Sequence, residues 1–306
     1  MARPLRIQFP GARYHVIDRG NYRHPVFRST GAAQAFTRVL DEAARCHGWR
    51  LHAHALIPNH FHLALETPEA NLVEGMHWLL GTFASRFNRF RGERGHLFQG
   101  RYQALLVEDD AHLVRLINYI HLNPVQAQLV PLERLPDFRW SSMRAFARGP
   151  RPGWLSAATL LAHLGLTDNA GGWRSYLDLL AEIARHPLQL AAEEEEFTSG
   201  WSIGSPNWKS EMLAAHPVLA DDPGISGAER RAANEERWQR ELAAALLEAG
   251  KSAADIAGDP KGSSWKIAAA VRLRLRARAP HRWIAASLNM GCAASVRVYV
   301  SRQINL

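Results

Sequence analysis

The stretch that decides the fold of the first half of this chain is Ile57-Pro-Asn-His-Phe-His-Leu-Ala-Leu-Glu66. It places His60 and His62 on either side of Phe61 in an apolar run. Successive side chains of a strand point to opposite faces, so residues two apart share a face. The two imidazoles would then project side by side, roughly 6–7 Å apart at the backbone. Neutral imidazole is a common metal ligand, so the pair suggests a metal site.

The preceding residues extend this run into a hairpin. Residues 51–66 alternate apolar and polar side chains around a break at Pro58-Asn59, which predicts two antiparallel strands. Two further histidines, His52 and His54, lie on the first strand. Histidines in strands are commonly hydrogen-bonded without any metal, so the pair on the second strand needs support from elsewhere. The opposite face of that strand would bury three apolar side chains against helices: Phe61, Leu63 and Leu65.

Composition places the chain among globular proteins. Its 306 residues are 47% hydrophobic and can hold two or three domains. No apolar run reaches the roughly 18 residues of a membrane helix, and the first residues lack the apolar core of a signal peptide. The two cysteines, Cys46 and Cys292, lie far apart and form no metal-binding motif. We therefore expect a reducing, cytoplasmic location without membrane association.

Charge is distributed unevenly along the chain. Residues 1–148 hold 19 Arg, no Lys and 12 acidic residues, a net charge of +7, and residues 149–260 carry −8. Residues 261–306 hold 9 basic residues and no acidic one. Two basic blocks around an acidic middle suggest two surfaces for a polyanion such as nucleic acid. Coding bias or ordinary solvated basic faces would give a similar composition.

The first 148 residues predict an α+β domain, an antiparallel sheet with packed helices. The expected order is strand, helix, two strands, helix, strand, helix, and a mixture of hairpins and helices favours this architecture. The expected segments are a strand at 14–18, helices at 31–47 and 71–90, the hairpin at 51–66, a strand at 103–107, and a helix at 111–122 that is capped by Asp109 or Asp110 and stopped by Pro124.

The rest of the chain has an all-α pattern. We predict an acidic helical connecting region at 149–235, in which the run Glu193–Glu196 is a solvated helix end or linker without chemistry. A basic helical region follows at 236–306. Within it, residues 281–302 have the pattern of a helix-turn-helix, with Asn289 at the turn where a left-handed conformation is needed. A plain pair of antiparallel helices fits the same pattern.

The helix at 111–122 carries a clean apolar stripe together with two polar residues of interest. Tyr119 and Asn123 are four residues apart, so they lie on one face at the edge of that stripe, whereas His121 projects from the opposite edge. A tyrosine in such a position most often serves packing.

Four stretches together resemble a known family. They are Tyr14-His-Val-Ile-Asp-Arg-Gly-Asn21, Pro58-Asn-His-Phe-His62, Gly95-His-Leu-Phe-Gln-Gly-Arg101 and Asn118-Tyr-Ile-His-Leu-Asn-Pro-Val125. In order and spacing they are similar to signatures of the HUH-type single-strand transposases (the IS200-like family), and most similar to the REP-associated tyrosine transposases. The resemblance covers roughly residues 1–148 and implies a ferredoxin- or RRM-like HUH domain there. The tail of longer members resembles residues 266–302.

The resemblance implies a chemistry and a substrate. His60 and His62 would hold Mg²⁺ or Mn²⁺ with Asn123 as the third ligand, and Tyr119 would be the nucleophile that forms a 5′-phosphotyrosine. The substrate would be single-stranded DNA with a REP-like palindromic hairpin, and relatives act as monomers or homodimers. Cleavage and rejoining through this intermediate would make the protein a DNA transposase.

Arginines are the candidate DNA contacts, because they bind phosphates and stack on bases. Among the aromatic residues interleaved with them, we assign Phe87 and Phe98 to core packing. The candidate arginines are Arg13, Arg19, Arg23, Arg86, Arg89, Arg94, Arg101, Arg297 and Arg302.

Two other functions remain open on the sequence. A domesticated, sequence-specific DNA-binding regulator would keep the basic regions and lose catalysis, although His60, His62 and Tyr119 are intact here. A rolling-circle replication initiator often has a second tyrosine three or four residues from the first, but the nearest tyrosine to Tyr119 is Tyr102.

Overall fold

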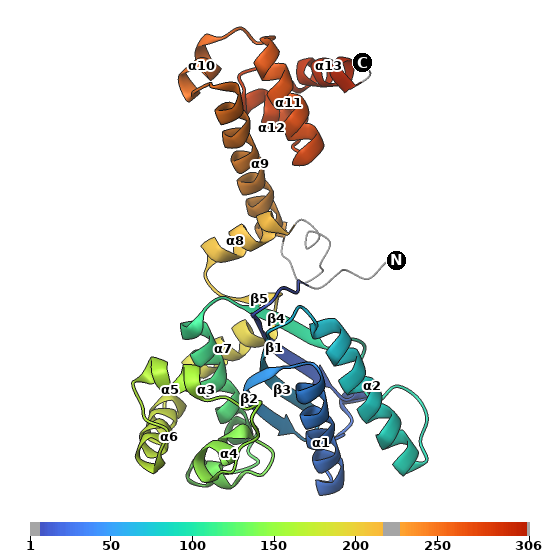
Figure 1. The fold of residues 1–306 in the computed structure, drawn as a ribbon, viewed down its shortest axis with the longest axis vertical. Coiled ribbons are helices and arrows are strands. Elements are labelled where there is room, and N and C mark those ends of the chain that lie inside the picture. Colours follow the sequence, from blue (N-terminus) through green and yellow to red (C-terminus); the bar gives the residue numbers. More distant parts are fainter. Residues whose placement is uncertain (1–6, 217–226, 305–306) are drawn as a thin grey trace. The chain divides into compact units, whose positions relative to one another are not determined.

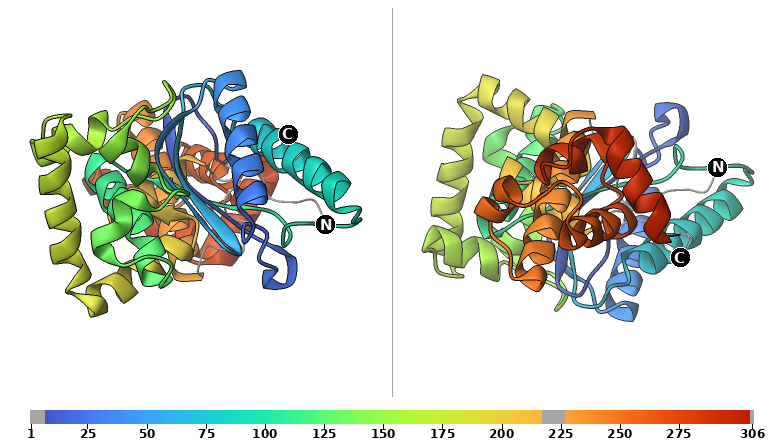
Figure 2. Two further views of the ribbon diagram at one scale, coloured as in Figure 1. Left: turned by 90° about the horizontal axis from the view of Figure 1, so that it is seen from below. Right: turned by 90° about the horizontal axis from the view of Figure 1, so that it is seen from above.

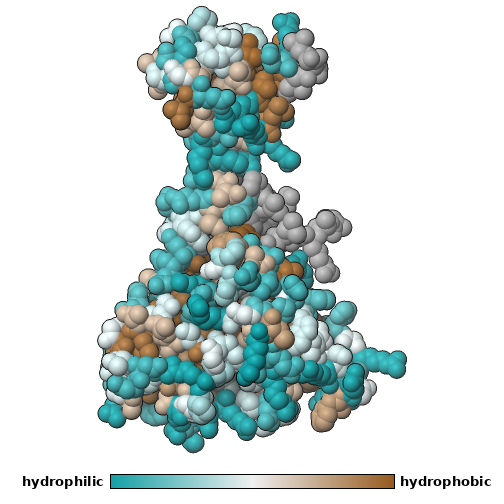
Figure 3. All heavy atoms as spheres, in the orientation of Figure 1, coloured by the Kyte–Doolittle hydropathy of each residue, from teal (hydrophilic) through white to brown (hydrophobic). Residues whose placement is uncertain are grey.

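The computed structural model describes residues 7–216 and 227–304. By its internal contacts the chain divides into two compact units, residues 1–205 and 206–306 (Figure 1). The domain boundaries predicted from the sequence, after residues 148 and 235, remain predictions. Within the described residues, none of the helices has the length and apolar character that a membrane crossing requires. Hydrophilic residues cover much of the visible face of each unit (Figure 3).

The first unit is built on a mixed sheet. Its strands lie in the order β2-β3-β1-β4-β5. The first three pairings are antiparallel, as we predicted for this α+β region, but β4 and β5 pair in parallel, an edge pairing that the sequence did not indicate. The strands are β1 (Ala12–Arg19), β2 (Arg50–Ile57), β3 (His60–Thr67), β4 (Gln103–Val107) and β5 (Ser202–Ile203).

Helices cover both faces of this sheet. Figure 2 shows the strands edge-on between α1 and α2 on one side and α3, with α4 to α7 packed around it, on the other. The helices are α1 (Thr30–Cys46), α2 (Leu72–Arg91), α3 (Asp110–Gln126), α4 (Ser142–Arg148), α5 (Ala158–Leu164), α6 (Ala170–Ala184) and α7 (Pro187–Thr198), with short 3-10 turns η1 (Asn21–Arg23) and η2 (Leu132–Asp137).

The pleat of β3 separates an apolar face from a polar one. Phe61, Leu63 and Leu65 are fully buried on the side of α1 and α2, as predicted. Phe61 packs against Phe36 with 4.9 Å between ring centroids, inside a larger cluster of aromatic rings. Since neighbouring side chains alternate, this burial turns His60 and His62 toward the side of α3.

The helix α3 begins as predicted but ends later. The carboxylate of Asp109 accepts a hydrogen bond from the backbone N–H of His112 and caps the helix. Our expectation that Pro124 stops the helix was wrong, because the helix continues to Gln126. Proline removes one N–H donor, and its ring crowds the carbonyl four residues earlier, so the packing of α3 on the sheet must outweigh this cost. Asn123 therefore lies within regular helix, one turn after Tyr119.

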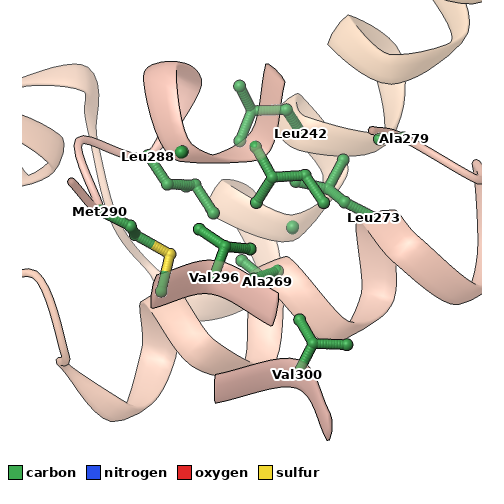
Figure 4. Packing of buried hydrophobic residues seen from close by; sticks show 12 residues of the cluster. Leu242, Ala269, Leu273, Ala279, Leu288, Met290, Val296 and Val300 are labelled. Carbon is green, nitrogen blue, oxygen red and sulfur yellow. The ribbon is translucent and has the colours of Figure 1, made fainter. Parts of the chain in front are cut away.

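The second unit is entirely helical in its described residues. Its core is a cluster of apolar side chains that includes Leu273, Leu288 and Val296 (Figure 4). The helices at 281–302 are joined by a turn in which Asn289 has a φ of 49°, as the sequence suggested, but a DNA-reading role for them stays a prediction. The helices are α8 (Pro206–Ala215), α9 (Gly227–Ala249), α10 (Ala253–Gly258), α11 (Ser264–Arg276), α12 (His281–Ser287) and α13 (Ala293–Ile304).

Candidate active site

The two histidines of the opening motif lie side by side on β3. In the register with β1, His62 is opposite Ile17 and His60 is opposite Arg19. The His60 and His62 ring centroids are 4.8 Å apart, with the ring planes nearly perpendicular. Because β3 is paired on both edges, these two side chains are presented from a rigid part of the sheet.

Tyr119 comes from α3 and meets this pair. Its ring centroid lies 5.6 Å from that of His62, and its side chain is 2% exposed. The side chain of Asn123, one helical turn later, is hydrogen-bonded to Tyr119. The structure therefore brings together the four residues that the sequence selected from two separate motifs.

These residues border one cavity of about 540 Å³. Its wall is mostly polar, and two exposed arginines, Arg19 and Arg101, stand on it. Such a lining suits an anionic ligand, since arginine pairs with phosphate oxygens. The full lining is Ile17, Asp18, Arg19, His60, His62, Gln99, Arg101, Gln103, Tyr119, Asn123, Gln126, Ala127, Glu194 and Thr198.

Burial controls the ionisation of the site. Desolvation lowers the pKa of His60 to about 4 and that of His62 well below its ordinary value, so both rings are neutral at neutral pH. Desolvation and the nearby carboxylate of Glu194 raise the pKa of Tyr119, whereas the hydrogen bond from Asn123 and the charge of Arg19 oppose that rise. The tyrosine is therefore a neutral phenol in the resting site.

The histidine nitrogens are suited to hold a cation. The Nδ1 atom of His60 lies 2.6 Å from the Oδ1 atom of Asn59. The second ring nitrogen of His60, Nε2, is therefore the one that could bind a cation. The Nε2 atom of His62 is buried without a hydrogen-bond partner among the described residues. A buried polar atom without a partner is costly, and a metal ion would satisfy it. The residues present thus fit a divalent ion.

The far side of the site is formed by α7, which the sequence did not connect with it. The ring of Phe197 lies 5.3 Å from that of Tyr119, between centroids. Two ion pairs hold α7 on α3, because Arg115 contacts both Glu193 and Glu196. The acidic run Glu193–Glu196, to which we assigned no chemistry, therefore holds α7 against α3. Arg115 lies four residues before Tyr119 on the same helix face. It was the one sequence feature that could have indicated an acidic helix packed beside Tyr119.

The remaining candidate arginines are distributed widely. Arg86 forms two hydrogen bonds with the carboxylate of Glu42, and Arg13 pairs with Asp110 and Glu66, so these three acids already neutralise two of the predicted contacts. Exposed positions away from the cavity lining are occupied by Arg23, Arg89, Arg94, Arg297 and Arg302, the last two in the second unit.

Other histidines near the motifs have structural partners. His52 is buried against Glu66, with 3.1 Å between Nε2 and Oε2. His121 is fully buried between the hydroxyls of Tyr176 and Ser142, each 2.8 Å from a ring nitrogen. His54 is also buried and packs against Trp154. None of these three lines the cavity.

A second group of metal-type ligands lies at the start of α3. The ligand atoms of Glu108, Asp109 and His112 are all within 4.8 Å of one another. These groups also have protein partners, because Asp109 caps the helix and Glu108 accepts hydrogen bonds from Ser205. The group is about two helical turns from Tyr119 along α3 and does not line the cavity.

Comparison with known proteins found similar solved structures and a matching family. One solved structure, described as a REP-associated tyrosine transposase bound to a REP hairpin, has 20% identity and a TM-score of 0.40 over 50% of this chain and 89% of that chain. A candidate transposase from Deinococcus radiodurans has 23% identity and a TM-score of 0.28 over 42% of this chain and 92% of that one. No curated protein matches. Residues 8–123 match the family described as "Transposase IS200 like", so this segment of the chain is similar to that family.

Proposed function

We propose that this protein is a metal-dependent single-strand DNA endonuclease and strand transferase, with Tyr119 as its nucleophile. The observation that supports it best is the position of the Tyr119 ring, 5.6 Å from the ring of His62, in a cavity bordered by arginines. A neutral tyrosine buried beside two neutral histidines is a poor arrangement for packing alone, since polar groups are costly to bury.

His60 and His62 would hold Mg²⁺ or Mn²⁺ through their Nε2 atoms, and Asn123 would supply an amide oxygen as the third ligand. When bound, this cation would polarise the scissile phosphate and stabilise the charge that develops on it. In the resting site Asn123 is hydrogen-bonded to Tyr119, so one side chain serves both the nucleophile and the ligand set.

The covalent step conserves the phosphodiester bond energy. The phenolic oxygen of Tyr119 attacks phosphorus and forms a P–O bond, while the bond from phosphorus to the 3′-oxygen breaks. The phenolic proton leaves to a solvent base, and the 3′-oxygen is released as a hydroxyl. Attack by another 3′-hydroxyl on the 5′-phosphotyrosine reverses the step and joins DNA without ATP.

The arginines at the cavity define the substrate class. Arg19 and Arg101 are exposed on its wall and would bind phosphates of a strand that enters it. Tyr119 is 2% exposed, so the scissile nucleotide must reach it through the cavity, which favours a single strand over a stiff duplex. Following the family resemblance, we propose a REP-like hairpin as the flanking element.

A DNA-binding regulator without catalysis is the second candidate. It draws support from residues 261–306, where 9 basic residues and no acidic one surround the α12–α13 turn. It leaves the buried tyrosine and the histidine pair unexplained.

Cleavage of a labelled hairpin separates the two candidates. We expect cleavage and a covalent protein–DNA adduct with Mn²⁺, neither with EDTA, and neither from Tyr119→Phe, which should still bind the hairpin. Tyr102→Phe is the matched control, because Tyr102 is buried, lies outside the cavity lining and should be dispensable. An adduct that persists in Tyr119→Phe would reject the assignment.

A further inference from the structure

A chain of hydrogen bonds leads from α7 to the candidate metal ligand. The backbone carbonyl of Phe197 lies 2.9 Å from Nδ1 of His15, and Nε2 of His15 lies 2.9 Å from Nδ1 of His62. His15 stands on β1, two residues from Ile17, which is opposite His62. Its ring also stacks on that of His62 with 5.1 Å between centroids.

The direction of these hydrogen bonds follows from their ends. A carbonyl oxygen accepts and cannot donate, so Nδ1 of His15 must carry the proton. His15 is fully buried, and its described contacts are Phe197, His62 and Tyr119, so burial without a counter-charge favours the neutral ring. A neutral His15 then accepts at Nε2, and His62 must donate from Nδ1.

The consequence is felt at the other end of His62. A neutral imidazole that carries its proton on Nδ1 has an unprotonated Nε2 with a free lone pair. That Nε2 atom is the buried one without a hydrogen-bond partner among the described residues. The carbonyl of Phe197 thus sets the tautomer of His62 through two successive hydrogen bonds.

We infer that His15 is a positioning residue that holds His62 in the tautomer and orientation needed to bind the metal, and that α7 belongs to the active site because it anchors His15. The inference rests on the function proposed above. It also extends the site beyond residues 8–123, the segment that matches the transposase family. Metal-bound histidines commonly depend on such a partner at their second nitrogen.

The tautomer can be measured without any metal. In long-range ¹H–¹⁵N spectra of the metal-free full chain, we expect both His15 and His62 to be protonated at Nδ1 and unprotonated at Nε2. Assignment would come from the loss of one set of signals in His15→Gln and of the other in His62→Gln. A His62 ring protonated at Nε2 in the wild-type protein would overturn the inference.

Metal affinity provides the second test, with Mn²⁺ alone as the probe. His15→Leu removes the acceptor for His62 and should weaken Mn²⁺ binding about 10- to 100-fold, measured from the free-ion EPR signal. His15→Gln keeps a polar group near the position of Nε2 and should recover most of that loss. His54→Leu is the control, because His54 is a buried histidine of the same sheet outside the cavity lining, and it should bind Mn²⁺ normally.

The outcomes distinguish the two levels of the proposal. A folded His15→Leu protein with wild-type Mn²⁺ affinity would reject the role of His15 while leaving the proposed function intact. Wild-type protein that binds no Mn²⁺ and cleaves no hairpin would reject the proposed function and the role of His15 with it. Thermal unfolding of both leucine variants keeps a general loss of stability separate from a specific loss of the ion.

Discussion

At the residue scale, the proposed site combines a protonated candidate nucleophile with neutral candidate ligands. Tyr119 is buried, and its pKa lies above the ordinary value, so in the proposed reaction its proton must leave as the attack proceeds. The hydrogen bond from Asn123 and the charge of Arg19 both favour the phenolate and therefore act in the direction of the reaction. Because both histidines are neutral, neither would need deprotonation before binding a cation.

Asn123→Ala tests whether this residue serves the ion as well as the tyrosine. We expect weaker Mn²⁺ binding and slower adduct formation, each by about 10-fold, because a ligand and a hydrogen bond to Tyr119 are lost together. Titration of Mn²⁺ followed by adduct formation at saturating Mn²⁺ measures the two effects separately. Unchanged Mn²⁺ affinity would remove Asn123 from the ligand set and leave it as a partner of Tyr119.

Acid should destabilise the fold through its buried histidines. Desolvation lowers the pKa of His15 and His121 to about 3 and that of His54 to about 4. Below pH 6.5, the ordinary pKa of histidine, these residues bind protons in the unfolded chain but stay neutral in the folded chain. The free energy of unfolding therefore decreases as the pH decreases. Between pH 6.5 and 5 each of the three should contribute up to about 1.4 kcal/mol per pH unit.

Urea unfolding across that window measures the slope, and most carboxylates stay ionised there. His54→Leu should reduce the slope of the free energy of unfolding against pH by the contribution of one histidine. A free energy of unfolding that stays constant from pH 7 to 5 would contradict the buried neutral rings.

Part of this site could be predicted from the sequence and part could not. The spacing of His60 and His62 on a strand, and of Tyr119 and Asn123 on a helix, follows from local geometry, and the family signatures linked the two. His15 was not predicted, because its proposed role depends on a carbonyl 182 residues away. Backbone atoms have no sequence signature, so such a partner becomes visible when the fold is known.

At the element scale, local patterns predicted the sheet and the helices of the first unit well. The alternation of apolar and polar residues predicted the two faces of β3, and the capping residue Asp109 predicted the start of α3. The two misses share a cause, because tertiary packing outweighed a local signal. Helix α3 continues past Pro124 while packed on the sheet, and the two-residue strand β5 exists through its pairing with β4. Neither the continuation of α3 nor strand β5 has a local sequence pattern strong enough to predict it.

Two glycines of α2 should respond oppositely to alanine. A Cβ atom on Gly75 would lie 2.1 Å from the Trp49 ring, which is buried and tied to Asn71 by a 2.9 Å hydrogen bond. We expect Gly75→Ala to destabilise the protein by about 1–3 kcal/mol. Gly81 has open space at its Cβ position, so Gly81→Ala should stabilise it by roughly 0.5–1 kcal/mol through helix propensity. Chemical denaturation of both variants checks the pair, and equal effects would contradict the close packing on Trp49.

At the scale of the whole molecule, the compact unit that contains the site ends at residue 205. Residues 149–205 include α7, which carries the carbonyl bound to His15 and the acids bound to Arg115. A chain of 1–205 should therefore fold and form the DNA adduct, whereas a chain of 1–148 should lose it. Circular dichroism and the hairpin assay compare the two, and an active 1–148 chain would contradict the role of α7.

The basic second unit should add affinity through phosphate contacts. Residues 261–306 carry 9 basic residues, although Lys266 is buried with its ammonium donating to the carbonyls of Ile256 and Asp259 and is unavailable for DNA. We expect the 1–205 chain to bind hairpin DNA more weakly and with a shallower dependence on salt than the full chain, because fewer counterions are released. Fluorescence anisotropy over a salt series measures both, and identical slopes would exclude the second unit from binding.

The central claim is that Tyr119 forms a covalent bond with DNA. The most direct measurement is peptide mapping by mass spectrometry after the full chain reacts with a hairpin-bearing single strand and Mn²⁺. The account predicts one modified peptide, with the 5′-phosphate of the downstream fragment attached to Tyr119, and none when EDTA replaces Mn²⁺. Attachment to any other residue, or hairpin cleavage with no protein-bound DNA, would contradict it.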